Sequence, residues 1–166
     1  MRREMIEEEA SALIAACGTR NPFSVARQTG ATIRYKELGS LKGMYLCLNG
    51  ERYIVINPSL PPSVRRIVCA HELGHDRCHR ELALNHALHE FAVWSGGDRT
   101  EYEANLFAAA LLIDDDDLLS NAELGPEQLV QLLGVDTNLI AIKLSSMHAR
   151  GYDCPLLSYR SDFLMK

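Results

Sequence analysis

The sequence predicts an α+β fold, in which a small three-stranded antiparallel sheet packs beside several α-helices. Its 166 residues suffice for one domain whose core needs no disulfide or metal to hold it together. Strand-like runs cluster between residues 32 and 56, and two of them flank the hairpin dipeptide Asn49-Gly50. Elsewhere, apolar residues recur at helical spacing over longer segments.

Composition and charge narrow the class of protein. Hydrophobic residues make up 47% and charged residues 23% of the chain, which is ordinary for a globular domain. The net charge of −5 provides no basic surface for nucleic acid or an anionic membrane. The charged N-terminus lacks the apolar core of a signal peptide, and no apolar run reaches the length of a transmembrane helix. We therefore expect a soluble, cytoplasmic protein.

The cysteines agree with that expectation. An odd number at irregular spacing predicts neither a disulfide framework nor a C-x-x-C metal site: Cys17, Cys47, Cys69, Cys78 and Cys154. Most of them lie among apolar residues, as small buried thiols do. Free thiols are typical of intracellular proteins.

The first third of the chain contains two predicted helices and then the strands. Apolar residues at helical spacing predict a helix over Arg3–Cys17 that ends at Gly18. Asn21-Pro22 is typical of a cap followed by proline at the first helical position, and it begins a short helix through Gln28. The predicted strands follow: Thr32–Lys36, Met44–Leu48 and Tyr53–Ile56. An exposed edge of this sheet could receive an extended peptide, or the sheet could serve only to back the core.

An H-E-x-x-H motif, His71-Glu72-Leu73-Gly74-His75, lies within a helix predicted over residues 63–80. Positions i and i+4 of a helix share one face, so both imidazoles can reach the same metal ion. Glu72 lies beside the pair and can hold a water without being a ligand. This is the arrangement of a zinc peptidase, in which the metal acidifies water and a carboxylate takes the proton.

Other candidate ligands near the motif fit less well. Cys78 follows His75 by three positions, but Glu103 suits the pattern of a third zinc ligand better. His79 lies on the same helical stripe as His75, yet it is too far from the first histidine to share one ion easily. His86 and His89 lack a matching geometry. We expect these three histidines to be packed or to lie at the surface.

A helix predicted over residues 99–113 supplies the candidates for a third ligand. Its alanines permit close approach to another helix. Glu103 shares a face with Phe107 and Ala110, where a carboxylate is costly unless it is paired or bound to metal. Glu101 is the other candidate, because Glu101 lies toward Ala104, Asn105 and Ala108. Periodicity leaves both residues open.

Two motifs in this order resemble the ImmA/IrrE family of zinc metallo-endopeptidases: His71-Glu72-Leu73-Gly74-His75, and Glu103-Ala104-Asn105 with Phe107-Ala108 and Leu111-Leu112. The second motif of that family reads E-x-E-A-[ND]-x-F-A-x-x-L-L. The likeness spans residues 20 to 150. The sequence departs from the family at Ile113-Asp114, where the family usually has Met-Pro. This difference is expected to alter how the helix over residues 99–113 ends and the shape of the rim of the active-site cleft, but not the metal ligands.

The resemblance implies a zincin-like metallopeptidase domain, with zinc held by His71, His75 and Glu103 and with Glu72 as the catalytic base. Mn²⁺ and Fe²⁺ are also compatible with two imidazoles and a carboxylate. Residues 1–166 are expected to form one domain, with a catalytic core over residues 20–120 and a C-terminal helical pair over residues 125–150. Members of the family commonly cleave or antagonise helix-turn-helix repressors of phages and mobile elements, so such a repressor is the implied partner.

The C-terminal third resembles a DNA-binding motif. Residues 126–133 and 137–150 predict two helices around the turn Gly134-Val135-Asp136, as in a helix-turn-helix. The second helix offers only Lys143 early on, whereas phosphate contacts need several cations. Packing of this pair on the rest of the domain is the favoured interpretation. The run Asp114–Asp117 is interpreted as a solvated helix junction, with an acidic rim for a basic substrate as the alternative.

Three functional hypotheses follow. The leading one is a zinc endopeptidase in which Glu72 passes a proton from water to the leaving amine. Tyr102 or a nearby histidine could stabilise the oxyanion. The alternative is a regulator that binds a repressor through the peptidase fold without cutting it. A DNA-binding transcription factor that uses the C-terminal helices is the third, and the acidic net charge argues against it.

Overall fold

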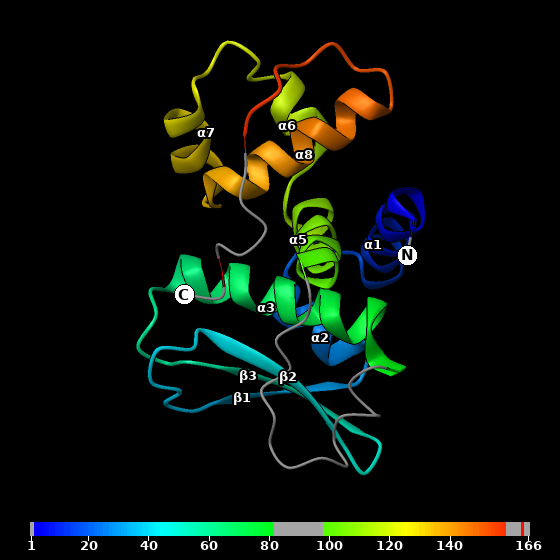
Figure 1. The fold of residues 1–166 in the computed structure, drawn as a ribbon, viewed down its shortest axis with the longest axis vertical. Coiled ribbons are helices and arrows are strands. Elements are labelled where there is room, and N and C mark those ends of the chain that lie inside the picture. The colour runs from blue at the N-terminus through cyan, green and yellow to red at the C-terminus, as the bar shows by residue number, and fades with distance from the viewer. Residues whose placement is uncertain (1, 82–97, 159–163, 165–166) are drawn as a thin grey trace.

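The computed structural model describes residues 2–81, 98–158 and 164. A small sheet lies on one side of the long helix α3 (Pro62–Cys78), and α5 (Asp98–Leu112) and α8 (Thr137–Ala149) lie on the other (Figure 1). Helices and a separate small sheet confirm the α+β class. His86 and His89 lie outside the described residues.

The first two helices have the predicted bounds, α1 (Arg3–Cys17) and α2 (Pro22–Gln28). Gly18 ends α1 with a φ of 64°, a left-handed conformation that glycine adopts without strain. Asn21 caps α2, since its side-chain oxygen accepts hydrogen bonds from the backbone N–H groups of Phe23 and Ser24 at 3.0 and 3.2 Å. Local capping chemistry therefore determines where α1 ends and where α2 begins.

The three strands are β1 (Ala31–Tyr35), β2 (Gly43–Leu48) and β3 (Glu51–Ile56), in the order β1-β3-β2. β2 and β3 form the predicted antiparallel hairpin. Its turn residues, Asn49 and Gly50, have φ angles of 51° and 83°. Positive φ at both positions is what a two-residue hairpin turn requires, and the Asn-Gly dipeptide tolerates it.

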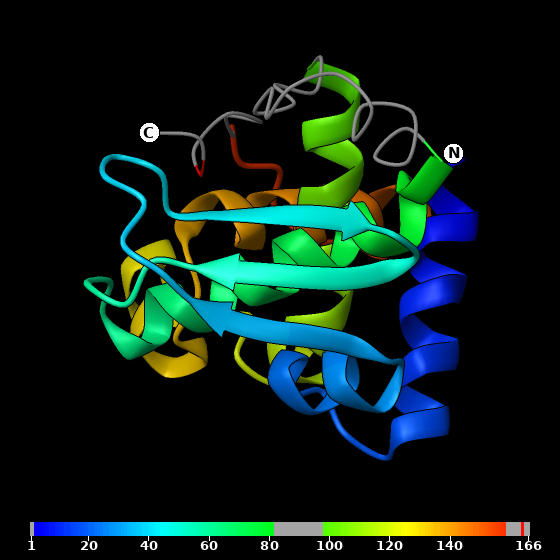
Figure 2. The same cartoon turned by 90° about the horizontal axis from the view of Figure 1, so that it is seen from below.

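The prediction of an all-antiparallel sheet is wrong for β1, which pairs with β3 in parallel. The connection over residues 36–42 crosses the end of β3, where Lys36 donates to the carbonyl of Ile56 and Asn57 donates to that of Lys42. The hairpin therefore returns β3 between the other two strands (Figure 2). Among the described strands, β1 and β2 are the outer ones.

Helix α5 lies in contact with α1, α3 and α8 and forms the centre of the core. Its residues from Ala104 to Leu112 are buried on every side. Where α3 crosses it, a Cβ on Gly74 would stand 2.9 Å from the carbonyl oxygen of Ala104 and 3.2 Å from the Cβ of Phe107. The close approach that the alanines predicted is therefore present, and it requires glycine on the facing helix.

The C-terminal part consists of α6 (Asp115–Leu119), α7 (Pro126–Leu133) and α8. Helix α8 packs on α5 and buries most of its length, including Lys143, whose ammonium lies 2.6 Å from Asp115. The helix that resembles a recognition helix is thus packed into the protein, in agreement with the favoured interpretation. All five cysteines are free thiols. Within the described segments, no helix has the length and apolarity needed to cross a membrane.

Candidate metal centre

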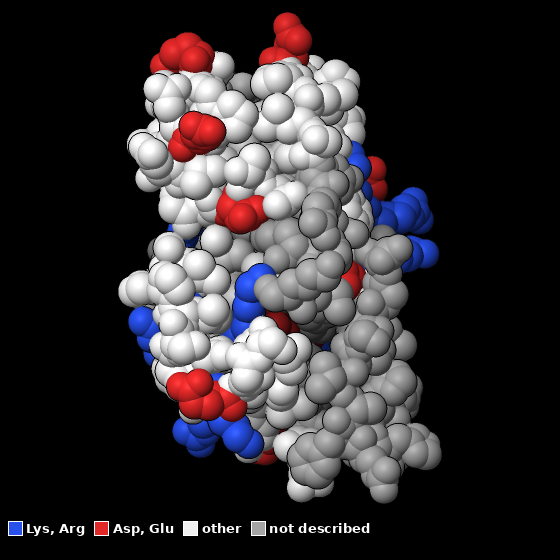
Figure 3. Space-filling model, turned by 60° about the vertical axis from the view of Figure 1, so that its left-hand side comes forward, with Lys and Arg blue, Asp and Glu red and all other residues white. Residues whose placement is uncertain are grey.

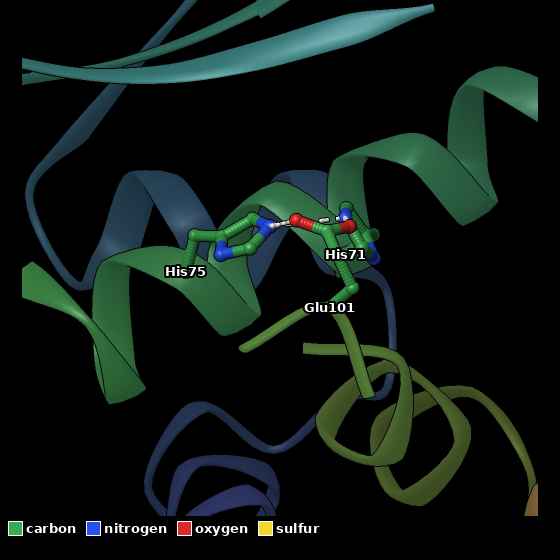
Figure 4. A group of neighbouring side chains, drawn as sticks. All are labelled: His71, His75 and Glu101. Carbon is green, nitrogen blue, oxygen red and sulfur yellow. Dashed lines mark hydrogen bonds and ion pairs between the residues drawn. The ribbon is translucent and has the colours of Figure 1, made fainter. Parts of the chain in front are cut away.

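The structure brings together His71, His75 and Glu101. The two histidines are one turn apart on α3, and their Nε2 atoms are 3.0 Å apart. Glu101, from the first turns of α5, places one carboxylate oxygen 3.3 Å from Nε2 of His71 and the other 3.4 Å from Nε2 of His75. Figure 4 shows this carboxylate between the two rings. All three side chains are buried, and one ligand atom from each lies within 4.8 Å of the others.

Glu103, which the resemblance implied as the third ligand, lies beside His79. Its carboxylate lies 2.9 Å from Nε2 of His79 and accepts a hydrogen bond of 3.0 Å from Nε of Arg99. It is connected to His75 through the ring of His79 and does not belong to the group of three. Where α3 crosses α5 at Ala104, the Glu101 carboxylate lies beside the two histidines, and the assignment of Glu103 as the third ligand stays a prediction.

Asn105 contacts His71, and the sequence did not predict this contact. Its side-chain oxygen lies 2.8 Å from Nδ1 of His71, and the residue is fully buried. An amide oxygen can only accept, so Nδ1 of His71 donates. Glu101 and Asn105 have i, i+4 spacing, as His71 and His75 do. That matched spacing is the signal in the sequence that could have indicated the contact between Asn105 and His71.

His79 is packed, as expected, but it also contacts a residue of the candidate centre. It is the C-cap of α3, and its backbone leaves the helical conformation there, with a φ of −132°. Its Nδ1 lies 3.1 Å from Nδ1 of His75. The other nitrogen of each candidate histidine ligand thus has a buried partner, which fixes the orientation of both rings.

Glu72, the predicted base, is buried beside His71, with 7% of its surface exposed. Burial raises the pKa of its carboxyl to about 7, and a hydrogen bond from the backbone N–H of Tyr45 acts in the opposite direction. Tyr45 belongs to β2, so the outer strand contacts the carboxylate directly. A carboxylate with this pKa can accept and release a proton near neutral pH.

The electrostatics favour a cation between the rings. Burial alone would raise the pKa of Glu101, but hydrogen bonds with His71 and His75 outweigh it and lower the pKa to about 2. Burial lowers the pKa of His75 to about 4, so this ring is neutral. For His71, burial also lowers the pKa, but the contacts with Glu101 and the charge of Glu72 leave it above its usual value. An ionised carboxylate therefore faces a neutral ring and a ring that readily takes positive charge.

Two other candidates from the sequence lie apart from this group. The Tyr102 hydroxyl accepts a 3.0 Å hydrogen bond from Nη2 of Arg3, which ties α5 to α1. Burial raises the pKa of the Cys78 thiol to about 12, so it stays protonated at neutral pH. A metal ligand needs the thiolate, which makes Cys78 a poor ligand here.

The aspartate run begins α6 and is paired in its first half. Asp114 caps α6 and forms an ion pair with Arg20, which also bonds the last carbonyls of α5. Asp115 pairs with Lys143 and Arg150, whereas the last two aspartates are exposed. The Ile113-Asp114 departure thus forms the junction between two helices. On the face in Figure 3, acidic groups lie over the α6–α7 end and basic groups lie mostly lower, toward the sheet.

Comparison with known proteins agrees with the geometry. Residues 26–145 match the model of a peptidase family described as the IrrE N-terminal-like domain. The chain belongs to this family. The resemblance to the ImmA/IrrE family is thereby confirmed, and the chain carries a metallopeptidase-like domain. A relative from Bacillus phage phi105, "Uncharacterized immunity region protein 2", is 31% identical over 142 residues, which cover 84% of this chain and 89% of that protein.

Proposed function

We propose that this chain is a zinc-dependent endopeptidase that cleaves a helix-turn-helix repressor. One observation carries the proposal: two imidazole nitrogens and a carboxylate converge at a buried point, beside a further buried carboxylate. Catalytic zinc sites use such a donor set and leave a position for water and substrate. The Nε2 atoms of His71 and His75 are 3.0 Å apart, and a cation between them would use both lone pairs. The donors fit zinc, with Mn²⁺ and Fe²⁺ as compatible alternatives.

We propose His71, His75 and Glu101 as the residues that hold the metal. Glu101 is preferred to Glu103 because its carboxylate faces both rings, whereas Glu103 faces His79 and Arg99. The depressed pKa of Glu101 supports this choice, since a ligand carboxylate must be ionised.

Zinc held by these residues supplies Lewis acidity, which lowers the pKa of a water and polarises a carbonyl group. Glu72 orients that water and accepts its proton on a carboxylate oxygen as the water attacks the scissile carbonyl carbon. The same oxygen then gives the proton to the amine nitrogen as the C–N bond breaks. Glu72 is thus ionised again at the end of the reaction, and one water has been consumed.

The outer edge of β2 offers a place for an extended substrate. Tyr45 donates its backbone N–H to Glu72, and a Cβ on Gly43 would lie 3.2 Å from Oε1 of Glu72. A peptide that paired with β2 through main-chain hydrogen bonds would therefore pass beside the base. Such pairing requires the substrate to be extended. It therefore favours cleavage within a segment of the substrate protein that can detach from the rest of its fold.

The choice of substrate is supported by the family and by the phage relative. ImmA/IrrE proteins commonly act on helix-turn-helix repressors, and the relative from phage phi105 is named an immunity region protein. We therefore propose a repressor of a phage or mobile element as the target.

The test uses the purified full chain, zinc, and a helix-turn-helix repressor, chosen from any that the genomic neighbourhood of its gene encodes. We expect defined repressor fragments by mass spectrometry with the wild-type protein, and none after a chelator is added. Glu72→Gln should bind zinc as the wild type does and yield no fragments. The control Glu8→Gln changes an exposed glutamate of α1 and should cleave normally.

The outcomes separate the two functional hypotheses. A stable complex without fragments, at any zinc concentration, would favour a regulator that binds the repressor without cutting it. Full cleavage by Glu72→Gln would remove the proposed mechanism.

A further inference from the structure

A chain of buried hydrogen bonds leads from Glu103 through His79 to His75. The His79 ring lies between the other two side chains, 3.1 Å from Nδ1 of His75 and 2.9 Å from Oε2 of Glu103. These three residues are 5 to 6% exposed. Because the three side chains are buried, each polar group depends on its protein partner, and water does not readily replace a hydrogen bond that is removed.

The direction of each hydrogen bond in this series follows from Glu103, the residue at its end farthest from the candidate metal centre. The carboxylate of Glu103, which also faces the cation of Arg99, can only accept, so Nε2 of His79 carries a hydrogen. In the neutral imidazole that carries its hydrogen on Nε2, Nδ1 is the acceptor, and Nδ1 of His79 is the atom that faces His75. Nδ1 of His75 must then donate to His79. The lone pair of His75 is left on Nε2, the atom that faces Glu101.

We propose that His79 and Glu103 are positioning residues that hold His75 as its Nδ1–H tautomer and present Nε2 to the metal. This inference rests on the proposed function, because it takes His75 as a ligand. Partners that accept from the second nitrogen of a ligand histidine typically contribute 10- to 100-fold to metal affinity. This series of hydrogen bonds also explains why Glu103 is buried although it lies outside the ligand group. His71 is held by the neutral amide of Asn105, whereas His75 is held through His79 by a charged group.

The first measurement needs no metal. Nitrogen NMR of the isotope-labelled, chelator-treated wild-type protein reports which nitrogen of each histidine carries the hydrogen. We expect His75 with hydrogen on Nδ1 and His79 with hydrogen on Nε2. The opposite tautomer of His75 would overturn the proposal.

The second measurement is zinc affinity, by competition with a chromophoric chelator. His79→Phe keeps a ring but removes the acceptor, and we expect zinc to bind about 10- to 100-fold more weakly. His79→Asn places an oxygen near the position of Nδ1, so it should recover part of that loss. Glu103→Gln keeps an acceptor but removes the charge, so its loss should be smaller than that of His79→Phe.

Arg77→Ala is the matched control. Arg77 lies on the same last turn of α3 and donates to Glu9 at 2.7 Å, so the variant loses a contact with α1 near the site. It should bind zinc as the wild type does and keep the His75 tautomer. An equal loss of zinc affinity in Arg77→Ala, or wild-type affinity in His79→Phe, would overturn the proposal.

The two proposals fail separately. If the wild type bound no zinc, the proposed function would be wrong, and the tautomer in the metal-free protein would still decide the role of His79. If His79→Phe did not fold, His79→Asn and Glu103→Gln would decide it, and wild-type zinc affinity in both would overturn the proposal.

Discussion

Gly74 of α3 lies directly against Ala104 of α5. A Cβ on Gly74 would stand 2.9 Å from the carbonyl oxygen and 3.0 Å from the Cα of Ala104. These are backbone atoms, so they cannot rotate out of the way. The missing side chain at position 74 therefore sets how closely the helix with His71 and His75 approaches the helix with Glu101.

Gly74→Ala should weaken zinc binding by moving the Glu101 carboxylate away from both rings. Overpacking typically costs about 1–3 kcal/mol, offset in part by about 1 kcal/mol from the higher helix propensity of alanine. We expect a modest loss in the free energy of unfolding and a clear loss of zinc affinity, measured by urea unfolding and by zinc titration. Gly125→Ala is the control, since its Cβ would meet only Gln128, at 3.7 Å. Unchanged zinc affinity in Gly74→Ala would show that the helix spacing does not determine the site.

A comparison of Glu101→Ala with Glu103→Ala identifies the third ligand. Removal of Glu101 takes away the carboxylate that faces both rings, so zinc affinity should fall further than it does in Glu103→Ala. Isothermal titration of each metal-free variant with zinc provides the two affinities. The reverse order would restore Glu103 as the ligand.

The pairing of Asp115 with Lys143 and Arg150 should make stability depend on pH. Burial raises the pKa of Asp115, but hydrogen bonds from Arg150 and Lys143 outweigh it and hold the pKa below the usual 3.8. The pair therefore stabilises the fold fully above the unfolded pKa, and the contribution is lost as the pH falls through the folded pKa. Asp115→Asn leaves the Lys143 ammonium, 8% exposed, without its carboxylate. We expect a loss of about 3 kcal/mol at pH 7, the low end for a buried pair.

Urea unfolding at neutral pH and at a pH below the folded pKa tests this linkage. The difference between the wild type and Asp115→Asn should shrink at the lower pH, because Asp115 is then protonated in both states of the wild type. Asp117→Asn, an exposed aspartate of the same run, is the control and should change stability little. A difference that stayed constant with pH would assign the effect to something other than this ion pair.

Gly43→Ala should reduce peptide cleavage while zinc affinity stays close to that of the wild type. The added Cβ would meet the Val68 side chain and lie 3.1 Å from the Val55 carbonyl oxygen and 3.2 Å from Oε1 of Glu72. β2 must then shift relative to α3, which changes the substrate edge and the base together. The measurement pairs kcat/KM for repressor cleavage with zinc titration. A parallel loss of zinc affinity would mean that the substitution disturbs the two helices and not the sheet edge.

Much of the fold follows from local chemistry that can be read in the sequence. The Asn21-Pro22 cap, the Asn49-Gly50 turn and the Gly134 helix end all occur where they were predicted. Each depends on a side chain or a φ angle within a few residues, so no long-range information is needed. The two histidines were predicted to share a face for the same reason.

The order of the strands and the choice of glutamate depended on contacts distant in the sequence. The parallel pairing of β1 with β3 results from the path of residues 36–42, which alternation of apolar residues does not encode. Glu101 and Glu103 could not be separated by periodicity because the residues of α5 that follow them, Ala104 to Leu112, are buried on every side. The contact of Gly74 with Ala104 accompanies an arrangement in which Glu101 lies beside His71 and His75, whereas Glu103 lies beside His79 at the end of α3.

The helices α3 and α5 carry the donor atoms, whereas the outer edge nearest to Glu72 belongs to β2. Leu46 and the half-exposed Leu48 lie two residues apart on one face of that strand, and none of the three donors belongs to it. Under the proposed function, substitutions in this one short strand would alter which substrates the protein accepts, while the metal donors on the two helices stay unchanged.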